Sequence, residues 1–248
     1  MDLKGKIAVV AGASGGVGRE VSLELGRRGV DVVLVARRKD VLTTIKEEIE
    51  RLGGSSSLYE CDLTNLTSVD ELVGDLEKNF EHVDILVNAV GVGVYKKLKD
   101  TSFEDWKRSL DVNVTAPFLL TQKLLPFLQK VEKAVVISMG SGMGRVAVAG
   151  RSPYCASKFA LRGLMLSLAK EFKKSNIKIC LLTLGSVLTS FGPLSLEKKM
   201  EKQKSGKKYL DPEDLAHTIV SKIENDSLED EVVIYPSQYF SENKKGKS

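Results

Sequence analysis

Two side chains suited to acid–base chemistry lie four residues apart, at Tyr154 and Lys158 in the segment Pro-Tyr-Cys-Ala-Ser-Lys. Apolar residues at helical spacing follow them, so we expect a helix with both side chains on one side. A tyrosine hydroxyl ordinarily titrates at about pH 10. A neighbouring ammonium favours the phenolate and lowers that pKa, which predicts a general acid or base. The alternative is an exposed pair, since any amphipathic helix can carry this spacing by chance.

Two polar residues upstream strengthen this interpretation. Ser141 follows an apolar run at 134–139 that we expect to be a strand. Its hydroxyl could hydrogen-bond a substrate oxygen as negative charge develops there. Asn113 interrupts an otherwise apolar helical stretch. A buried amide must be paired, so we expect Asn113 to hold a water molecule or a backbone carbonyl.

A glycine-rich turn lies between the first predicted strand and the first predicted helix, where residues 11–18 read Ala-Gly-Ala-Ser-Gly-Gly-Val-Gly. Glycines let the backbone turn tightly and approach a pyrophosphate, whose charge is bound by the amides of the helix N-terminus. A structural turn is the alternative, but the position between strand and helix favours a dinucleotide site. We expect this site to comprise Gly12, Ser14, Gly15, Gly16, Val17 and Gly18.

The end of the second predicted strand indicates which dinucleotide would bind. An NAD site usually has an acidic residue there, for the ribose 2′-hydroxyl. This chain has Arg37 and Arg38 instead. Two cations at the N-terminus of a helix interact unfavourably with the helix dipole, so their presence needs another reason. An arginine can hold a 2′-phosphate through charge-assisted hydrogen bonds. We therefore predict NADP(H) rather than NAD(H), bound by Arg37 with help from Arg38. A solvated helix start is the alternative.

Strand and helix patterns alternate along almost the whole chain, and the fold that they predict would position the candidate catalytic and cofactor-binding residues. Alternating strands and helices imply a parallel sheet covered on both faces, in a doubly wound α/β (Rossmann) fold. Ser102 with Asp105, and Asp211 before Pro212, predict two helix starts. Six apolar runs and a weaker seventh are the expected strands, at 7–11, 32–36, 58–61, 83–88, 134–139, 177–182 and 231–235.

We expect residues 1–248 to form one domain, because no repeat or linker is evident. The lysine-rich stretch at about 190–210 interrupts the alternation after the sixth strand, where such folds place a substrate lid. A solvated charged face also explains its lysines. Tyr95, Met143 and Phe191 fall in loops expected at the cleft mouth, and residues 243–248 are expected to be a disordered tail.

Composition excludes several classes of protein. The net charge of +4 is spread along the chain and does not indicate a nucleic-acid-binding face. The three cysteines form no pair pattern and the two histidines have no metal-ligand spacing, which favours reduced thiols and no metal site. No apolar run is long enough for a membrane span, and no signal peptide is expected. These features predict a cytoplasmic location.

Taken together, these motifs resemble the short-chain dehydrogenase/reductase family over essentially the full length. The tetrad of that family corresponds to Asn113, Ser141, Tyr154 and Lys158. The family's spacing before the tyrosine selects Ser141 over Ser138, which we expect to be structural. The chain departs from the family pattern at Ala11, where threonine is usual, and lacks the proline before Gly185. The resemblance adds cofactor contacts at Asp62, Leu63, Asn88, Ala89, Gly185, Val187 and Thr189.

The resemblance also implies a mechanism. Hydride passes between the nicotinamide and a small carbonyl or alcohol, while Tyr154 donates or accepts the proton. Lys158 binds the nicotinamide ribose and lowers the tyrosine pKa, Ser141 holds the substrate oxygen, and Asn113 anchors a water molecule that relays protons. A homodimer or homotetramer is implied as well.

Two other functions remain open at this stage. One is an NADP(H)-binding sensor or scaffold without turnover. The other is sugar-nucleotide epimerisation or dehydration, which uses similar chemistry but resembles longer chains. The identity of the substrate does not follow from the sequence, because this fold serves many chemistries.

Overall fold

The computed structural model describes residues 1–236, which form a seven-stranded parallel sheet in the order β3-β2-β1-β4-β5-β6-β7. The strands are β1 (Ile7–Ala11), β2 (Asp31–Ala36), β3 (Ser55–Glu60), β4 (Ile85–Asn88), β5 (Ala134–Met139), β6 (Ile177–Leu184) and β7 (Glu231–Ile234). The helices are α1 (Gly16–Arg27), α2 (Lys39–Arg51), α3 (Leu66–Asn79), α4 (Phe103–Leu110), α5 (Ala116–Leu128), α6 (Ser152–Glu171), α7 (Leu196–Lys204) and α8 (Pro212–Glu224).

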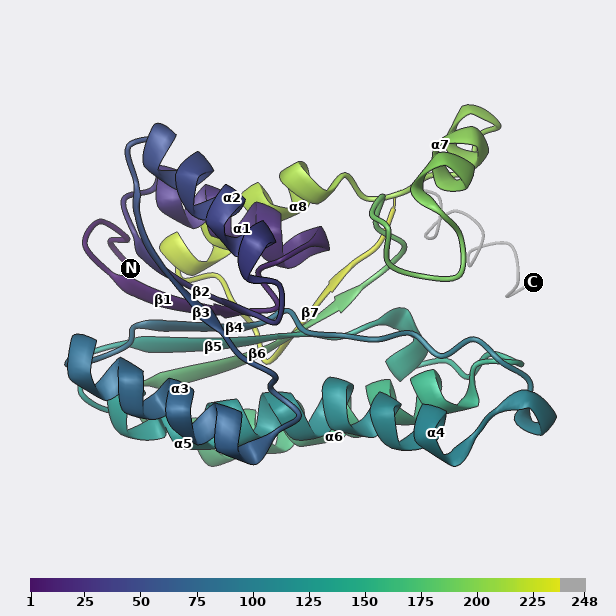
Figure 1. The fold of residues 1–248 in the computed structure, drawn as a ribbon, viewed down its shortest axis with the longest axis horizontal. Coiled ribbons are helices and arrows are strands. Elements are labelled where there is room, and N and C mark those ends of the chain that lie inside the picture. The colour runs from purple at the N-terminus through teal and green to yellow at the C-terminus, as the bar shows by residue number, and fades with distance from the viewer. Residues whose placement is uncertain (237–248) are drawn as a thin grey trace.

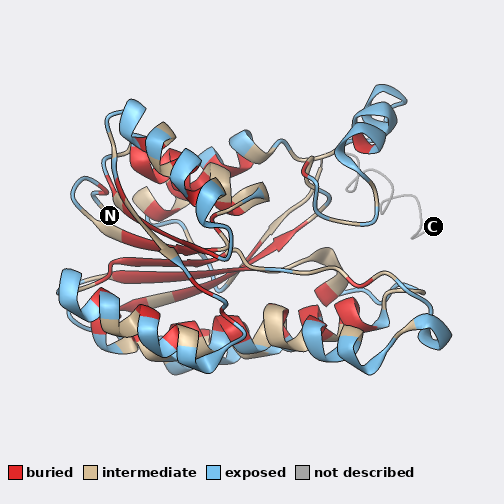
Figure 2. Cartoon of the chain, viewed as in Figure 1, coloured by how far each residue is buried: buried red, intermediate tan, exposed pale blue. Residues whose placement is uncertain are grey.

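The sheet lies between two layers of helices, with α1, α2 and α8 on one face and α3, α4, α5 and α6 on the other (Figure 1). Each face of the sheet packs against its own cluster of buried apolar side chains. The central strands are buried on both faces, as Figure 2 shows. The predicted doubly wound α/β fold is therefore confirmed.

The strand order reverses beside β1, which pairs with β2 on one side and β4 on the other. Val10, for example, lies opposite Leu34 of β2 and Val87 of β4. Doubly wound sheets bind ligands in a crevice at such a reversal. The crevice lies outside the carboxyl ends of the strands. The glycine turn follows β1 directly, so the chain enters this crevice there.

Five predicted strands differ in extent from the observed ones. β2 and β7 differ by one residue at one end, and β4 begins at Ile85 rather than at 83. β3 begins at Ser55 rather than at 58 and ends at Glu60, because the serine-rich half of this edge strand pairs with β2 although it is not apolar. β6 continues to Leu184, two residues past the predicted end. The predicted helix starts are confirmed: Ser102 and Asp105 form a capping box, and the carboxylate of Asp211 accepts hydrogen bonds from the backbone N–H groups of Glu213 and Asp214.

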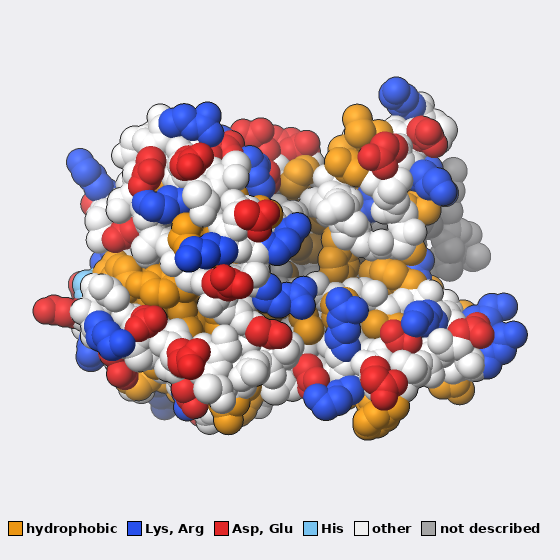
Figure 3. Space-filling view, in the orientation of Figure 1, with side chains coloured by type: hydrophobic (Ala, Val, Ile, Leu, Met, Phe, Trp, Pro, Cys, Tyr) orange, Lys and Arg blue, Asp and Glu red, His pale blue; other side chains and the backbone are white. Residues whose placement is uncertain are grey.

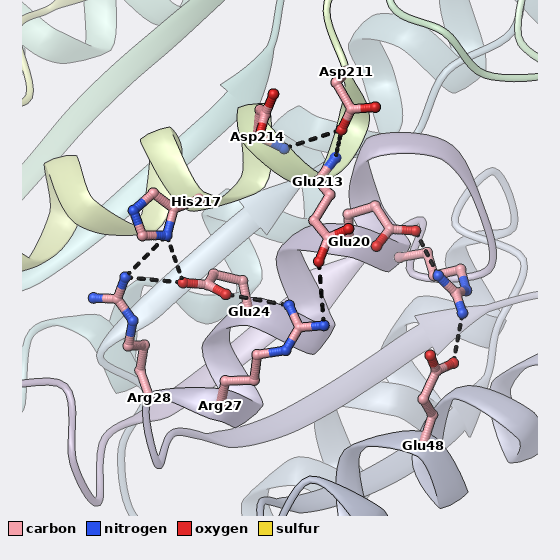
Figure 4. Close-up of polar contacts among 10 residues, drawn as sticks. Glu20, Glu24, Arg27, Arg28, Glu48, Asp211, Glu213, Asp214 and His217 are labelled. Atoms are coloured by element: carbon pink, nitrogen blue, oxygen red, sulfur yellow. Dashed lines mark hydrogen bonds and ion pairs between the residues drawn. The ribbon is translucent and has the colours of Figure 1, made fainter.

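Helices α1 and α8 are joined by polar contacts as well as by apolar packing (Figure 4). Glu24 of α1 pairs with His217 of α8 at 3.2 Å, and Arg27 of α1 reaches Glu213 of α8 at 3.5 Å. Glu24 also pairs with Arg28 at the end of α1, at 2.9 Å. Glu24 is buried, but Arg27, Arg28, Glu213 and His217 stay partly exposed, and ion pairs that water still reaches stabilise a protein by only about 0–1 kcal/mol each. Apolar burial therefore dominates this interface, and His217 contributes a structural contact to Glu24.

The stretch between β6 and α8 contains α7, which projects beyond the ends of the strands (Figure 1). Most of its lysines are exposed, but Lys199 is buried. Its ammonium donates hydrogen bonds to the carbonyl oxygens of Thr189 at 2.8 Å and Val187 at 3.3 Å, and to that of Phe191. Lys199 therefore anchors α7 to the loop that follows β6. The predicted tail at 243–248 lies outside the described residues.

A search of residues 1–236 for membrane-spanning helices found none that is sufficiently long and apolar. Within the same residues, no group of three or more potential metal-ligating side chains comes together.

Candidate active site

A cavity of about 1210 Å³ opens at the carboxyl ends of the strands. It begins at the glycine turn, passes the ends of β4 and β5, and continues beneath the segment that carries α7. Figure 3 shows a hollow on this face, with hydrophobic side chains inside it and cationic side chains at its edge. The cavity therefore combines a polar, glycine-lined half and a more apolar half.

Tyr154 lies in the first turn of α6, with Pro153 before it, and is 5% exposed. Its ring packs between two aromatic rings of the cavity wall. The centroid of Tyr95 is 5.6 Å away and that of Phe191 is 6.0 Å away, both tilted. Tyr95, Phe191 and Met143 all line the cavity, as their loop positions suggested.

Burial raises the pKa of the Tyr154 hydroxyl. A hydrogen bond with Ser141 and the positive charge of Arg151 act in the opposite direction but do not overcome burial. The expectation that Lys158 lowers this pKa is therefore wrong. The reason is geometric, because the Lys158 ammonium lies 5.9 Å from the ring centroid and is bonded elsewhere.

Lys158 is 4% exposed, and its ammonium donates a hydrogen bond of 2.8 Å to the carbonyl oxygen of Met139 at the end of β5. Burial lowers the pKa of this amine to about 8. The helix is held against the neighbouring loop at this point, since a Cβ at Gly144 would lie 2.7 Å from the Lys158 carbonyl oxygen. Lys158 is thus fixed at the cavity wall.

Asn113 is fully buried in a π-helical turn, Asp111–Thr115, between α4 and α5. Its side chain accepts a hydrogen bond from the N–H of Val92 at 2.8 Å and donates one to the Val92 carbonyl oxygen at 2.9 Å. It also donates to the Ser157 hydroxyl at 2.9 Å. The prediction of a backbone carbonyl partner is confirmed. Asn113 does not line the cavity and instead holds the loop that follows β4.

The glycine turn lines the other half of the cavity through Gly12, Ser14, Gly15, Gly16 and Val17. Gly18 does not line it. A Cβ at Gly18 would lie 2.3 Å from the carbonyl oxygen of Gly12, so this glycine permits close packing within the turn. The Arg38 guanidinium donates to the Ser14 carbonyl oxygen at 2.7 Å and steadies the turn.

Arg37 lies at the same end of the cavity and is exposed. Within residues 1–236 its guanidinium makes no hydrogen bond, and its positive charge acts on Asp62. Two hydrogen bonds from Thr64, followed by the charge of Arg37, lower the pKa of the Asp62 carboxyl. Leu63 and Ala89 line the cavity nearby, and Thr64 is a lining residue that the sequence analysis missed.

Asn88 differs from its predicted position. Its amide nitrogen donates to the hydroxyls of Thr121 and Ser138, each at 3.2 Å, and the residue is not part of the cavity wall. It joins β4 to β5 and α5, and Ser138 has the structural role expected of it. At the far side the cavity is lined by Gly185, Val187 and Thr189, so all three are accessible for the cofactor contacts expected of them.

Comparison with known proteins identifies the family. The family profile described as short chain dehydrogenase matches residues 6–199. The chain belongs to the short-chain dehydrogenase/reductase family. Members of this family are oxidoreductases, and the motifs named in the sequence fall within or next to the matched residues.

Two relatives are 32% identical to this chain. The fatty acyl-CoA reductase of Acinetobacter baylyi aligns over 90% of this chain and 74% of its own length. The glycine betaine reductase ATRR of Emericella nidulans aligns over 88% of this chain but only 17% of its own length, so the chain spans a small part of that protein. A metagenomic short-chain oxidoreductase solved in complex with NADP has 29% identity and a TM-score of 0.81, over 96% of this chain and all of its own.

The two positions at which the chain departs from the family pattern lie in closely packed surroundings. Ala11 ends β1 and is fully buried. Gly185 follows β6 without a preceding proline, and a Cβ there would lie 2.6 Å from the ring of Pro236. The close packing of Pro236 therefore requires a glycine at this position.

Gly12→Ala tests the rigidity of the turn. Gly12 has a φ of +83°, and an added Cβ would lie 2.7 Å from the backbone nitrogen of Val90. The alanine would have to adopt a left-handed backbone conformation, and its Cβ would be overpacked against Val90. Together these effects should lower the free energy of unfolding by about 2–4 kcal/mol. Gly74→Ala in α3 is the control, because its Cβ meets nothing and alanine favours helix. Denaturant unfolding of both variants gives the comparison; equal stability would contradict the tight fit at Gly12.

Proposed function

We propose that this protein is an NADP(H)-dependent oxidoreductase that interconverts a small carbonyl compound and its alcohol. The observation that carries the proposal is one cavity lined by the glycine turn, Arg37, Ser141, Tyr154 and Lys158. The NADP complex of the 29% identical relative supports the cofactor, and the name of the acyl-CoA reductase supports reduction. Following NADPH absorbance over a panel of ketones and aldehydes, with NADH in parallel, tests it. Tight NADPH binding without oxidation of any panel member would instead favour the sensor or scaffold.

The residues of the turn suit the pyrophosphate of such a cofactor. Gly16 has a φ of +55°, and a Cβ there would face Thr189 across the cavity at 3.8 Å. Backbone N–H groups at the start of α1 are oriented for an anion, and this helix has no acidic residue in its first turn. Arg37 would hold the 2′-phosphate. When bound, the nicotinamide supplies or accepts the hydride.

Four residues of the chain have proposed roles in the chemistry. Tyr154 donates its phenolic proton to the carbonyl oxygen in reduction and takes it back in oxidation. Its raised pKa keeps it protonated at neutral pH, which suits reduction. The Ser141 hydroxyl hydrogen-bonds the same oxygen, and Lys158 is placed to bind ribose hydroxyls. Asn113 is a positioning residue that acts through the Val92 backbone.

The pH dependence of reduction should distinguish Lys158 from Tyr154. The Lys158 amine is charged below its pKa of about 8 and loses its proton as the pH rises through that value. kcat/KM should therefore be level at about pH 6–7 and decline above about pH 8. In Lys158→Arg the cation persists, because an arginine does not deprotonate in this range. The decline should then move to higher pH, and an unchanged decline would rule out Lys158 as its source.

Three further features belong to this proposal. Residues 190–210, anchored by Lys199, would act as the substrate lid. The whole chain would act as one domain in the cytoplasm. Phe103 and Trp106 of α4 are 72% and 40% exposed, which supports the expected homodimer or homotetramer, because large exposed apolar side chains mark interaction surfaces.

A further inference from the structure

The charged side chains that line the cavity are almost all cationic. They are Arg37, Arg38, Asp62, Arg108, Arg151, Lys158, Lys199, Lys207 and Lys208. The chain as a whole has nearly balanced charge, with 37 lysines and arginines against 33 acidic residues. Among residues 1–236 the one carboxylate that lines the cavity, that of Asp62, lies in the field of Arg37 at the end assigned to the adenosine. The rest of the cavity therefore has a strong positive potential that favours an anion.

The proposed cofactor and the fold account for only part of this charge. Arg37 and Arg38 face the glycine turn, and Lys158 is assigned to the ribose. Lys199 is bonded to three backbone carbonyls. Three further cations line the cavity: Arg108 of α4, Arg151 at the start of α6 and Lys207 after α7.

Among these cations, Arg151 lies next to the proposed chemistry. It is half-buried at the N-cap of α6, and its guanidinium lies 5.2 Å from the ring centroid of Tyr95, which packs on Tyr154. Its charge lowers the pKa of both tyrosines against the effect of burial. The electrostatic field of Arg151 therefore reaches the proton donor.

Arg151 has no acidic partner among residues 1–236. Its contacts there are the Tyr95 ring and a hydrogen bond to the sulfur of Met143 at 3.5 Å. A guanidinium that is partly removed from water without a carboxylate is costly, and its planar donors fit carboxylate or phosphate oxygens. The same cavity is also lined by the apolar side chains of Val146, Val148 and Leu194. This half of the cavity thus suits a molecule with an apolar body and one anionic group.

We propose that the substrate is a carbonyl compound with an anionic group, carboxylate or phosphate, near the reacting carbonyl, and that Arg151 binds this group. The inference rests on the proposed function and names the substrate class of the same site. Bidentate hydrogen bonds from the guanidinium would orient the carbonyl toward Tyr154 and Ser141. The apolar wall would receive the remaining carbon chain.

Three ketones that share one reacting group test the proposal with NADPH: acetoacetate, acetonylphosphonate and methyl acetoacetate. Acetoacetate has a carboxylate, acetonylphosphonate a phosphonate, and the ester no charge. We expect wild type to show a kcat/KM at least about tenfold higher for one of the anions than for the ester. The better anion identifies which group the site prefers.

Substitutions then assign the preference to Arg151. The anion preference is the kcat/KM for the preferred anion divided by the kcat/KM for the ester. Arg151→Gln should lower this preference about tenfold. Arg151→Lys should restore part of the preference, because it keeps the positive charge but loses the planar donors. Arg145→Gln is the matched control: it removes the same charge from the same loop, but Arg145 does not line the cavity and lies 3.7 Å from Glu231. Its anion preference should equal that of wild type. Circular dichroism establishes that each variant is folded.

Two results would overturn the proposal while leaving the proposed function intact. One is reduction of the ester as efficiently as of both anions. The other is an anion preference that Arg151→Gln leaves unchanged. Absence of NADPH oxidation with all three compounds and with the wider panel would overturn both proposals.

Discussion

Tyr154→Phe is expected to lower kcat by about a thousandfold, within the range that general acid–base catalysis usually contributes. The phenyl ring keeps the packing against Tyr95 and Phe191 but has no proton to give to the carbonyl oxygen. NADPH affinity, measured by fluorescence titration, should stay within about twofold of wild type, because the hydroxyl is assigned to the substrate. The variant therefore separates loss of chemistry from loss of the site.

Tyr59→Phe provides the matched control for this experiment. Tyr59 lies in β3, is partly buried, and does not line the cavity. It loses the same hydroxyl group, so its kcat should remain near wild type. Substantial turnover by Tyr154→Phe would refute the assignment of Tyr154 as the proton donor and would require another acid in the cavity.

Arg37→Asp should change which dinucleotide the enzyme uses. We expect kcat/KM with NADPH to fall about a hundredfold, since a charge-assisted hydrogen bond is replaced by repulsion of the 2′-phosphate. NADH lacks that phosphate, and a carboxylate at this position can accept a hydrogen bond from its 2′-hydroxyl. The NADH value should therefore change by less than about threefold.

Lys39→Asp makes the same charge change two residues later, at the exposed start of α2 and outside the cavity. Its effect on the NADPH value should be less than about threefold. Equal losses with both cofactors in Arg37→Asp would eliminate the proposed 2′-phosphate contact. Arg38, which already donates a hydrogen bond to the Ser14 carbonyl oxygen, would then be the remaining candidate for binding the 2′-phosphate.

Several features could be predicted from the sequence because local physics determines them. Buried parallel strands must be apolar, which located β1 and β5 to the residue. Helix starts need a polar cap, which located α4 and α8 through Ser102 and Asp211. The glycine turn followed from its position between β1 and α1. Short motifs of this kind depend on neighbours in the chain, so the sequence alone is sufficient to find them.

Features that depend on residues far apart in the sequence were decided by the tertiary structure. The start of β3 in a serine-rich run depends on its partner β2. Asn88 joins Thr121 and Ser138 rather than lining the cavity, because pairing of β4 with β5 places these side chains together. Its amide nitrogen donates its hydrogen bonds to these two hydroxyls, although the local motif predicted a cofactor contact.

The Tyr154–Lys158 pair shows the same division between sequence and tertiary structure. The spacing of the two residues predicted that both lie on the same side of one helix. In the structure both side chains lie on α6, are buried and line the cavity. Burial, which only the fold provides, raises the pKa of Tyr154 and lowers that of Lys158. The fold also places the Lys158 ammonium against the Met139 carbonyl oxygen. The sequence alone determined which groups could carry out the chemistry. The tertiary structure decided their protonation and placed Arg151 beside them, because desolvation and charge depend on every element packed around a site.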